Sequence, residues 1–155
     1  MMKTRIAVVA VALSFVAAGA CFAANPQIGT WKLNEAKSKL AAGMGKNTTV
    51  TYVEQKDKIR VTVDGVDKDG KPTHAVWVGT ADGKAYKTQG NLAWDAAAYK
   101  VVNDHTYGIT TMKGGKMFAS GTSTVSADGK TRTVITTGKT ADGKKFTNKA
   151  VFNKR

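Results

Sequence analysis

Ala-Asp-Gly-Lys recurs at residues 81–84, 127–130 and 141–144 of this 155-residue chain, and residues 68–71 read Lys-Asp-Gly-Lys. Each copy lies between runs rich in Thr, Val, Ile, Tyr and Phe. Asp-Gly is a strong hairpin signal, because Gly adopts positive φ without steric cost and Asp tolerates it. The copies at 68–71 and 81–84 are 13 residues apart and those at 127–130 and 141–144 are 14 apart, which is the length of one strand plus one turn. The repeated turns therefore predict an antiparallel meander.

The residues between the turns alternate between apolar and polar side chains, which is the period of a half-buried strand. Ile59, Val61 and Val63, for example, share one face, and polar side chains occupy the other. The composition fits an all-β protein, with 16 Gly, two Pro and 42% hydrophobic residues. We expect about ten strands, or eight if short ones merge, at residues 29–34, around Val50 and Tyr52, and at 59–63, 73–80, 85–88, 99–103, 105–112, 116–125, 131–138 and 145–153.

Two segments depart from this alternation. Residues 35–42 (Glu-Ala-Lys-Ser-Lys-Leu-Ala-Ala) have the best helical composition after the N-terminal segment, with Asn34 as the N-cap and Gly43 and Gly45 as the stop. Residues 89–98 are the least regular, and we expect a long loop there that folds over a barrel mouth. The pattern thus predicts one short helix after the first strand and one long loop in the middle of the meander.

The number of strands predicts closure of the sheet. A twisted sheet of this size tends to curl and close, because closure removes exposed strand edges. The first and last strands would then pair with each other. The predicted fold class is all-β: an antiparallel up-and-down meander closing into a barrel of about 8–10 strands, with one short helix and an N-terminal signal helix.

The N-terminal segment has the three-part layout of a secretory signal peptide. Lys3 and Arg5 give it a positive start, residues 6–18 form an apolar core interrupted only by Ser14, and small residues follow. The apolar core is shorter than the roughly 20 residues that a membrane-spanning helix needs. We predict cleavage after Ala23, and thus a signal peptide at residues 1–23, with no transmembrane segment in the mature chain.

Cys21 allows an alternative at this site. It follows Ala-Gly-Ala at residues 18–20, which resembles a bacterial lipoprotein box, although Ala18 stands where such boxes usually have Leu. Cleavage after Ala23 would instead leave residues 24–155 as a single barrel domain without cysteine, and therefore without disulfides. We expect an exported, monomeric protein, periplasmic or extracellular, with lipid anchoring through Cys21 as the alternative.

The charge of the chain favours anionic partners. The formal net charge is +13, and loss of a segment carrying Lys3 and Arg5 and no acid leaves 22 basic and 11 acidic residues, or +11. Such a balance suits lipid head groups, acidic glycans or acidic proteins. The lysines are spread along the chain, and lysines also keep turns and sheet edges soluble. Export argues against nucleic acid as the partner, because the chain would leave the compartment that holds it.

The usual catalytic and metal-binding motifs are missing. His74 and His105 lie on different predicted strands without a neighbouring cluster of Cys or carboxylates. There is no Gly-x-Ser-x-Gly elbow, no Gly-rich loop before a helix and no paired carboxylates at a catalytic spacing. Asp-x-Asp-Gly at residues 67–70 lacks the later ligands of a calcium loop. We expect a protein that is not an enzyme and that uses no metal or cofactor.

Gly29-Thr30-Trp31 at the first strand, followed by hairpins to the C-terminus, resembles the calycin superfamily, which includes the lipocalins. The opening Gly-Thr-Trp-Lys-Leu-Asn, the later Ala-Lys-Ser-Lys and the Asp-Gly-Lys turns are similar to a group of small secreted bacterial proteins of uncharacterised function. The resemblance implies that Trp31 closes one barrel end and packs against a basic residue near the last strand, here Lys154 or Arg155. It also implies a cavity for an apolar small molecule.

Two functions follow from these expectations. The first is a lipocalin-like binding protein for a small apolar or amphipathic ligand. The second is an envelope-associated interaction protein with a packed interior, which would use its basic surface on anionic lipid, glycan or protein, because side chains can fill an eight-stranded barrel. The inward-facing residues that we predict to line a ligand cavity are Trp31, Tyr52, Trp77, Tyr107, Phe146, Asn148 and Phe152.

Overall fold

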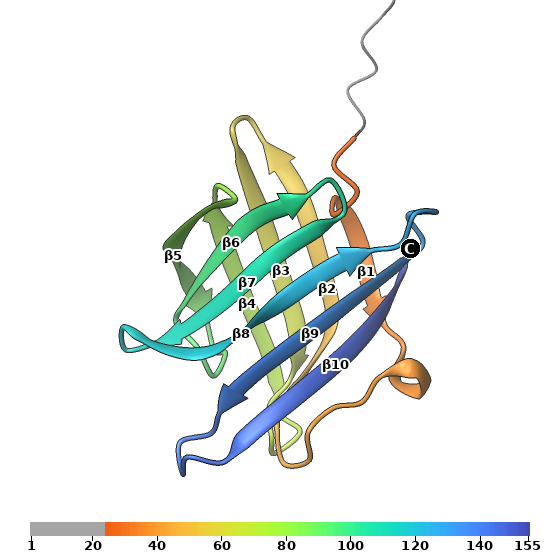
Figure 1. The fold of residues 1–155 in the computed structure, drawn as a ribbon. Coiled ribbons are helices and arrows are strands. Elements are labelled where there is room, and N and C mark those ends of the chain that lie inside the picture. Colours follow the sequence, from red (N-terminus) through yellow and green to blue (C-terminus); the bar gives the residue numbers. More distant parts are fainter. Residues whose placement is uncertain (1–23) are drawn as a thin grey trace, which may run out of the picture.

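Ten antiparallel strands form one closed sheet in the computed structural model, which describes residues 24–155 (Figure 1). Each strand pairs with its neighbours in the sequence, and β1 pairs with β10. The predicted signal peptide and Cys21 lie outside the described residues. The strands are β1 (Gly29–Leu33), β2 (Lys46–Gln55), β3 (Lys58–Val66), β4 (Pro72–Gly79), β5 (Asp82–Gly90), β6 (Ala96–Asn103), β7 (Thr106–Lys113), β8 (Lys116–Val125), β9 (Thr131–Lys139) and β10 (Lys145–Lys154).

The repeated Asp-Gly turns have the predicted backbone conformation. The glycines of the four turns all have φ between 71° and 84°: Gly70, Gly83, Gly129 and Gly143. In two of these turns the Asp side chain accepts a hydrogen bond from the backbone N–H two residues on: Asp82 Oδ1 from Lys84 N at 2.9 Å, and Asp128 Oδ1 from Lys130 N at 3.0 Å. The local chemistry of each turn thus reverses the chain where the sequence predicts it.

The first and last strands close the barrel as predicted. The register places Trp31 opposite Lys154 and Leu33 opposite Phe152. Lys154 Nζ lies 5.1 Å from the centre of the Trp31 ring, which is a cation–π contact. A Cβ at Gly29 would lie 2.7 Å from Lys154 Cε, so Gly29 leaves room for this lysine. The basic residue expected to pack against Trp31 is therefore Lys154.

The helix after β1 is shorter than predicted. Only η1 (Glu35–Lys37), a turn of 3-10 helix, forms, and Asn34 caps it by accepting a hydrogen bond from Lys37 N. The next residues instead follow β10, where Lys39 pairs with Lys149 and Ala41 N donates to Asn148 Oδ1 at 2.6 Å. Pairing with β10 thus overrides the helical tendency of residues 38–42.

The loop predicted at residues 89–98 is also shorter, because strands occupy both of its ends. β5 continues to Gly90, and β6 begins at Ala96. The three alanines at 96–98 pair with both β5 and β7, which supplies the backbone hydrogen bonds that a loop would lack. Only residues 91–95 remain as a connection.

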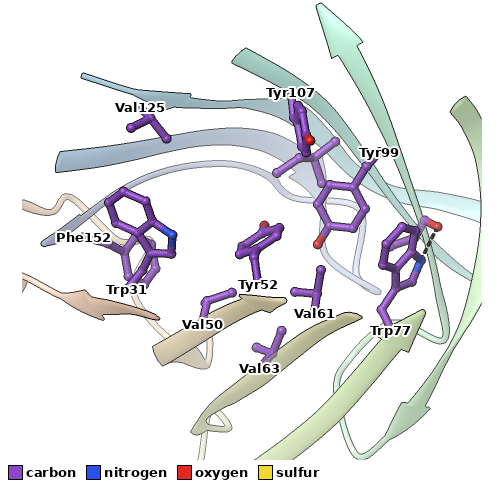
Figure 2. Packing of buried hydrophobic residues seen from close by; sticks show 12 residues of the cluster. Trp31, Val50, Tyr52, Val61, Val63, Trp77, Tyr99, Tyr107, Val125 and Phe152 are labelled. Atoms are coloured by element: carbon purple, nitrogen blue, oxygen red, sulfur yellow. Dashed lines mark hydrogen bonds between the residues drawn. The ribbon is translucent and has the colours of Figure 1, made fainter. Parts of the chain in front are cut away.

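Aromatic and branched side chains fill the middle of the barrel. Figure 2 shows Trp31 beside Phe152, and Tyr52 and Tyr99 between them and Trp77. Tyr99 contacts Trp77 edge-on with ring centres 4.6 Å apart, and Tyr52 with ring centres 6.1 Å apart. Such edge-to-face contacts each add about 0.5–1.5 kcal/mol to the burial of the rings. This packed layer separates the two ends of the barrel interior.

Candidate binding cavity

One end of the barrel, which we name the sealed end, is filled by residues 25–28 just before β1. Gln27 is fully buried there, and its side-chain amide donates to the backbone oxygens of His105 and Ser123, both at 3.1 Å. The Gln27 backbone oxygen accepts a hydrogen bond from Trp31 Nε1 at 2.9 Å. The segment therefore satisfies buried polar groups as it closes the sealed end.

The opposite end, which we name the cavity end, contains a hollow of about 210 Å³. Its rim includes exposed residues of the connecting segments, such as Gly45 and Ala93, whereas its deeper walls are buried. Half-buried apolar side chains surround the opening: Leu40, Met44, Leu92, Trp94 and Phe118. An apolar opening that residues 24–155 leave uncovered is typical of a ligand site.

The structure divides the seven predicted cavity residues into two groups. Tyr52, Phe146, Asn148 and Phe152 line the hollow. Trp31, Trp77 and Tyr107 do not line it.

The second group is buried in the packed layer or toward the sealed end. Trp77 donates its indole N–H to the Ala97 carbonyl at 2.9 Å, and the Tyr107 hydroxyl accepts from Asn25 Nδ2 at 2.5 Å. These hydrogen bonds hold Trp77 and Tyr107 in the packed interior, where the two side chains contribute to the fold. Asn148, the polar residue expected in the cavity, uses its carbonyl oxygen to hold Ala41 N of the segment that follows η1.

Arg132 is the functional candidate that the sequence pattern missed. It comes from β9, is 3% exposed and lines the hollow at its buried floor. Its Nε donates to Ser123 Oγ at 2.7 Å, and its Nη2 donates to the Tyr52 hydroxyl at 2.5 Å. The guanidinium also lies 4.8 Å from the Tyr52 ring centre and 5.4 Å from that of Phe152. A positive charge is thus held among aromatic rings and hydroxyl groups.

Tyr99 lies against the same part of the interior. Burial, followed by the neighbouring Tyr52, raises the pKa of its hydroxyl well above the usual value, and the charge of Arg132 opposes this shift only in part. The phenol is therefore neutral throughout the physiological range. The floor of the cavity consequently keeps the positive charge of Arg132 without a counter-charge from Tyr99.

Charged side chains are distributed unequally between the two ends. We counted charged side chains in the connections at each end, together with the strand residue on either side of each connection. The cavity end has ten lysines and five acidic side chains, a net charge of +5. The sealed end has five basic and four acidic side chains, a net charge of +1. The end with the hollow is therefore the more positive one.

The histidines lie apart from the cavity. His74 pairs with Asp64 at 2.6 Å, with both side chains about half exposed, and His105 is in the connection before β7. Within residues 24–155, no group of three or more His, Cys, Asp or Glu side chains is arranged to hold a metal ion. Among the same residues, no helix is long and apolar enough to cross a membrane.

Comparison with known proteins finds structural likeness but no family. No protein-family model and no curated protein matches the chain. A redesigned β-barrel shares 17% identity at a TM-score of 0.47, over 88% of this chain and 97% of that one. The redesigned barrel mFAP1, solved bound to DFHBI, shares 16% identity at a TM-score of 0.45, over 83% of this chain and 95% of that one. These likenesses concern the barrel and assign no ligand to this chain.

Proposed function

We propose that this chain is an exported, non-enzymatic binding protein that holds a small apolar or amphipathic molecule in the hollow at the cavity end. The observation that carries the proposal is the hollow itself, about 210 Å³ with Phe146 and Phe152 in its walls. It is larger than an engineered cavity of about 150 Å³ that binds benzene. It is smaller than the roughly 300–1,000 Å³ of sites that enclose a drug-sized ligand. The ligand is therefore small, or part of it extends through the mouth.

Export belongs to the proposal on the strength of the sequence. Residues 1–23 carry the layout of a signal peptide, so the mature protein would work in the periplasm or outside the cell. Retention and acylation of Cys21 is the alternative, and it would tether the barrel to a membrane. The mature chain acts as a monomer in this proposal, in line with its resemblance to the calycin superfamily.

Blocking the hollow tests the proposal. Ala150 lies in the wall of the hollow, so Ala150→Phe places a ring inside it. Thr147, on the same strand, is exposed, so Thr147→Phe adds the same ring outside the barrel. Octanol and octanoate serve as probes, and binding is followed by heteronuclear NMR titration.

We expect the wild type and Thr147→Phe to bind at least one probe, and Ala150→Phe to bind it at least tenfold more weakly. Urea unfolding of each variant verifies that the barrel is intact. Equal binding by all three proteins would place the probe outside the hollow and overturn the proposal. Absence of binding of either probe to the wild type would count against it as well.

A second candidate function is supported by the charge of the cavity end. Its net +5 suits contact with an anionic lipid surface, where exposed charges act over about 10 Å at 0.1 M salt. Sedimentation with phosphatidylglycerol vesicles at low and high salt would test it. Binding that disappears at high salt is expected, and equal retention on neutral phosphatidylcholine vesicles would refute it.

A further inference from the structure

We propose that the ligand of the hollow is a small monoanionic amphiphile, such as a carboxylate, whose charged group binds Arg132 at the floor while its apolar part points toward the mouth. This inference rests on the proposed function, because it names the chemistry of the molecule that the hollow takes.

Arg132 has unused hydrogen-bonding capacity. Nε and Nη2 have protein partners in Ser123 and Tyr52, whereas Nη1 is buried without a hydrogen-bond partner among the described residues. Every ion pair within residues 24–155 involves other side chains, so no carboxylate lies within 4.0 Å of this guanidinium there. A buried arginine in a folded protein is normally paired with an acid. Arg132 is instead surrounded by neutral groups.

The neutral surroundings stabilise the charge only in part. The contacts with the rings of Tyr52 and Phe152 are cation–π interactions, and the hydroxyls of Tyr52 and Ser123 accept its hydrogen bonds. Removing a charge from water is costly unless it is paired as well as hydrogen-bonded. An oxyanion on Nη1 would supply both the missing acceptor and the missing counter-charge, and such charge-assisted bonds are stronger than neutral ones.

The position of Arg132 sets the orientation of the ligand. Arg132 is at the buried floor, and the side chains between it and the mouth include Val134, Ala150 and Phe146. An anion that reaches Nη1 must therefore enter with its charged group first and leave its apolar part against these walls. The half-buried Leu92 and Trp94 at the rim would contact the end of that apolar part.

The charges that line the hollow indicate one negative charge on the ligand. Besides Arg132, the lining contains Lys46 and Asp67, and both belong to the rim region at strand ends. Lys46 is already paired with Glu35 at 2.8 Å. A dianion would need a second cation beside its charged group, and none of the other residues that line the floor is basic. The lysine-rich cavity end would in turn raise the local concentration of anions.

A matched pair of probes tests the inference. Octanoate and octanol share an eight-carbon chain and differ in the charge of the head group. Calorimetric or NMR titration at neutral pH compares the two for the wild type, Arg132→Met and Arg132→Lys. Met is a flexible, unbranched side chain without charge, and Lys keeps the charge without the fork of N–H donors.

We expect the wild type to bind octanoate at least tenfold more tightly than octanol. Arg132→Met should reverse this order, because a carboxylate would then be buried without a partner. Arg132→Lys should keep a preference for octanoate. The wild-type comparison alone keeps the inference testable if a variant fails to fold.

The outcomes separate the inference from the function on which it rests. Equal affinity of the wild type for the two probes, or an octanoate preference that survives in Arg132→Met, would overturn the inference and leave a binding protein for apolar molecules. Absence of binding of both probes would overturn the proposed function itself.

Discussion

The sealed end of the barrel depends on Gln27, and Gln27→Ala measures how much. The side chain is fully buried and takes part in three hydrogen bonds: two from its Nε2 to backbone oxygens and one that its Oε1 accepts from Ser123 Oγ at 3.1 Å. A typical hydrogen bond contributes about 0.5–1.5 kcal/mol, so three give roughly 1.5–4.5 kcal/mol. We take about 3 kcal/mol as the expected loss in the free energy of unfolding.

This loss is large enough to measure by heat as well as by urea. Unfolding entropy of about 2.1 cal/mol/K per residue, over a barrel of this size, converts about 3 kcal/mol into a decrease in Tm of roughly 10 °C. Equilibrium urea unfolding gives the free energy directly and can be followed by tryptophan fluorescence. Trp31 is a suitable probe, because its indole N–H donates to the Gln27 backbone oxygen. Gln55→Ala is the matched control, because Gln55 is exposed at the end of β2.

The control should change the free energy of unfolding by less than about 0.5 kcal/mol. An equal effect of the two substitutions would refute the role of Gln27 as a buried seal. A difference near the expected value would make this segment, which begins at the predicted cleavage site, part of the folded domain.

Three further predictions concern the backbone and the ionisable side chains. Gly121→Ala should destabilise the barrel more than Gly129→Ala, as measured by urea unfolding. A Cβ at Gly121 would overlap a backbone carbonyl oxygen of β9. A Cβ at Gly129 (φ 71°) would enter open space, so that substitution costs only about 1–2 kcal/mol of backbone strain. The hydroxyl of Ser126, and then the backbone N–H of Lys130, lower the pKa of Asp128 from its usual 3.8. This carboxylate therefore stabilises the fold above that pH, and its contribution is lost as the pH falls below it. Asp128→Asn should flatten the decline of the urea midpoint between pH 5 and pH 2. Burial raises the pKa of Tyr99 above the usual 10.0, so the stability from its neutral form is present below pH 10 and lost as the pH rises further. Tyr99→Phe should therefore reduce the fall of the urea midpoint above pH 10. An unchanged slope would contradict the burial of this hydroxyl.

The strands and turns could be predicted because they rest on local rules. An Asp-Gly pair reverses the chain wherever it lies, and the alternation at Ile59, Val61 and Val63 needs only a half-buried strand. Closure followed from the number of strands, and the pairing of β1 with β10 followed from closure. The helical tendency of residues 35–42 was misleading, because Asn148 and Lys149 of β10 compete for the same backbone groups.

Arg132 could not be placed inside the barrel from the sequence, because its strand is ambiguous. Val134 and Ile135 are adjacent, so either face of β9 could point inward, and a charged residue argues for the outward face. In the structure Ile135 is 44% exposed and Arg132 is buried. Its Tyr52 partner is 80 positions away in the sequence.

The hollow was harder to locate than the barrel. Inward-facing aromatic residues occur along the whole meander, and the sequence pattern does not say which of them fill the interior and which surround empty space. The division depends on how residues 25–28 fill one end while residues 91–95 leave the other end open. Both arrangements come from contacts between segments that are distant in the chain.

An NMR measurement of octanoate bound to the isotope-labelled barrel would examine the hollow and its arginine together. The proposed binding mode predicts intermolecular contacts between the terminal methyl group of octanoate and Leu92 and Phe146 near the mouth. It also predicts shifts of the Arg132 guanidinium resonances at the same octanoate concentrations. Contacts confined to outward side chains such as Met117 and Ile135, with the guanidinium resonances unchanged, would contradict it.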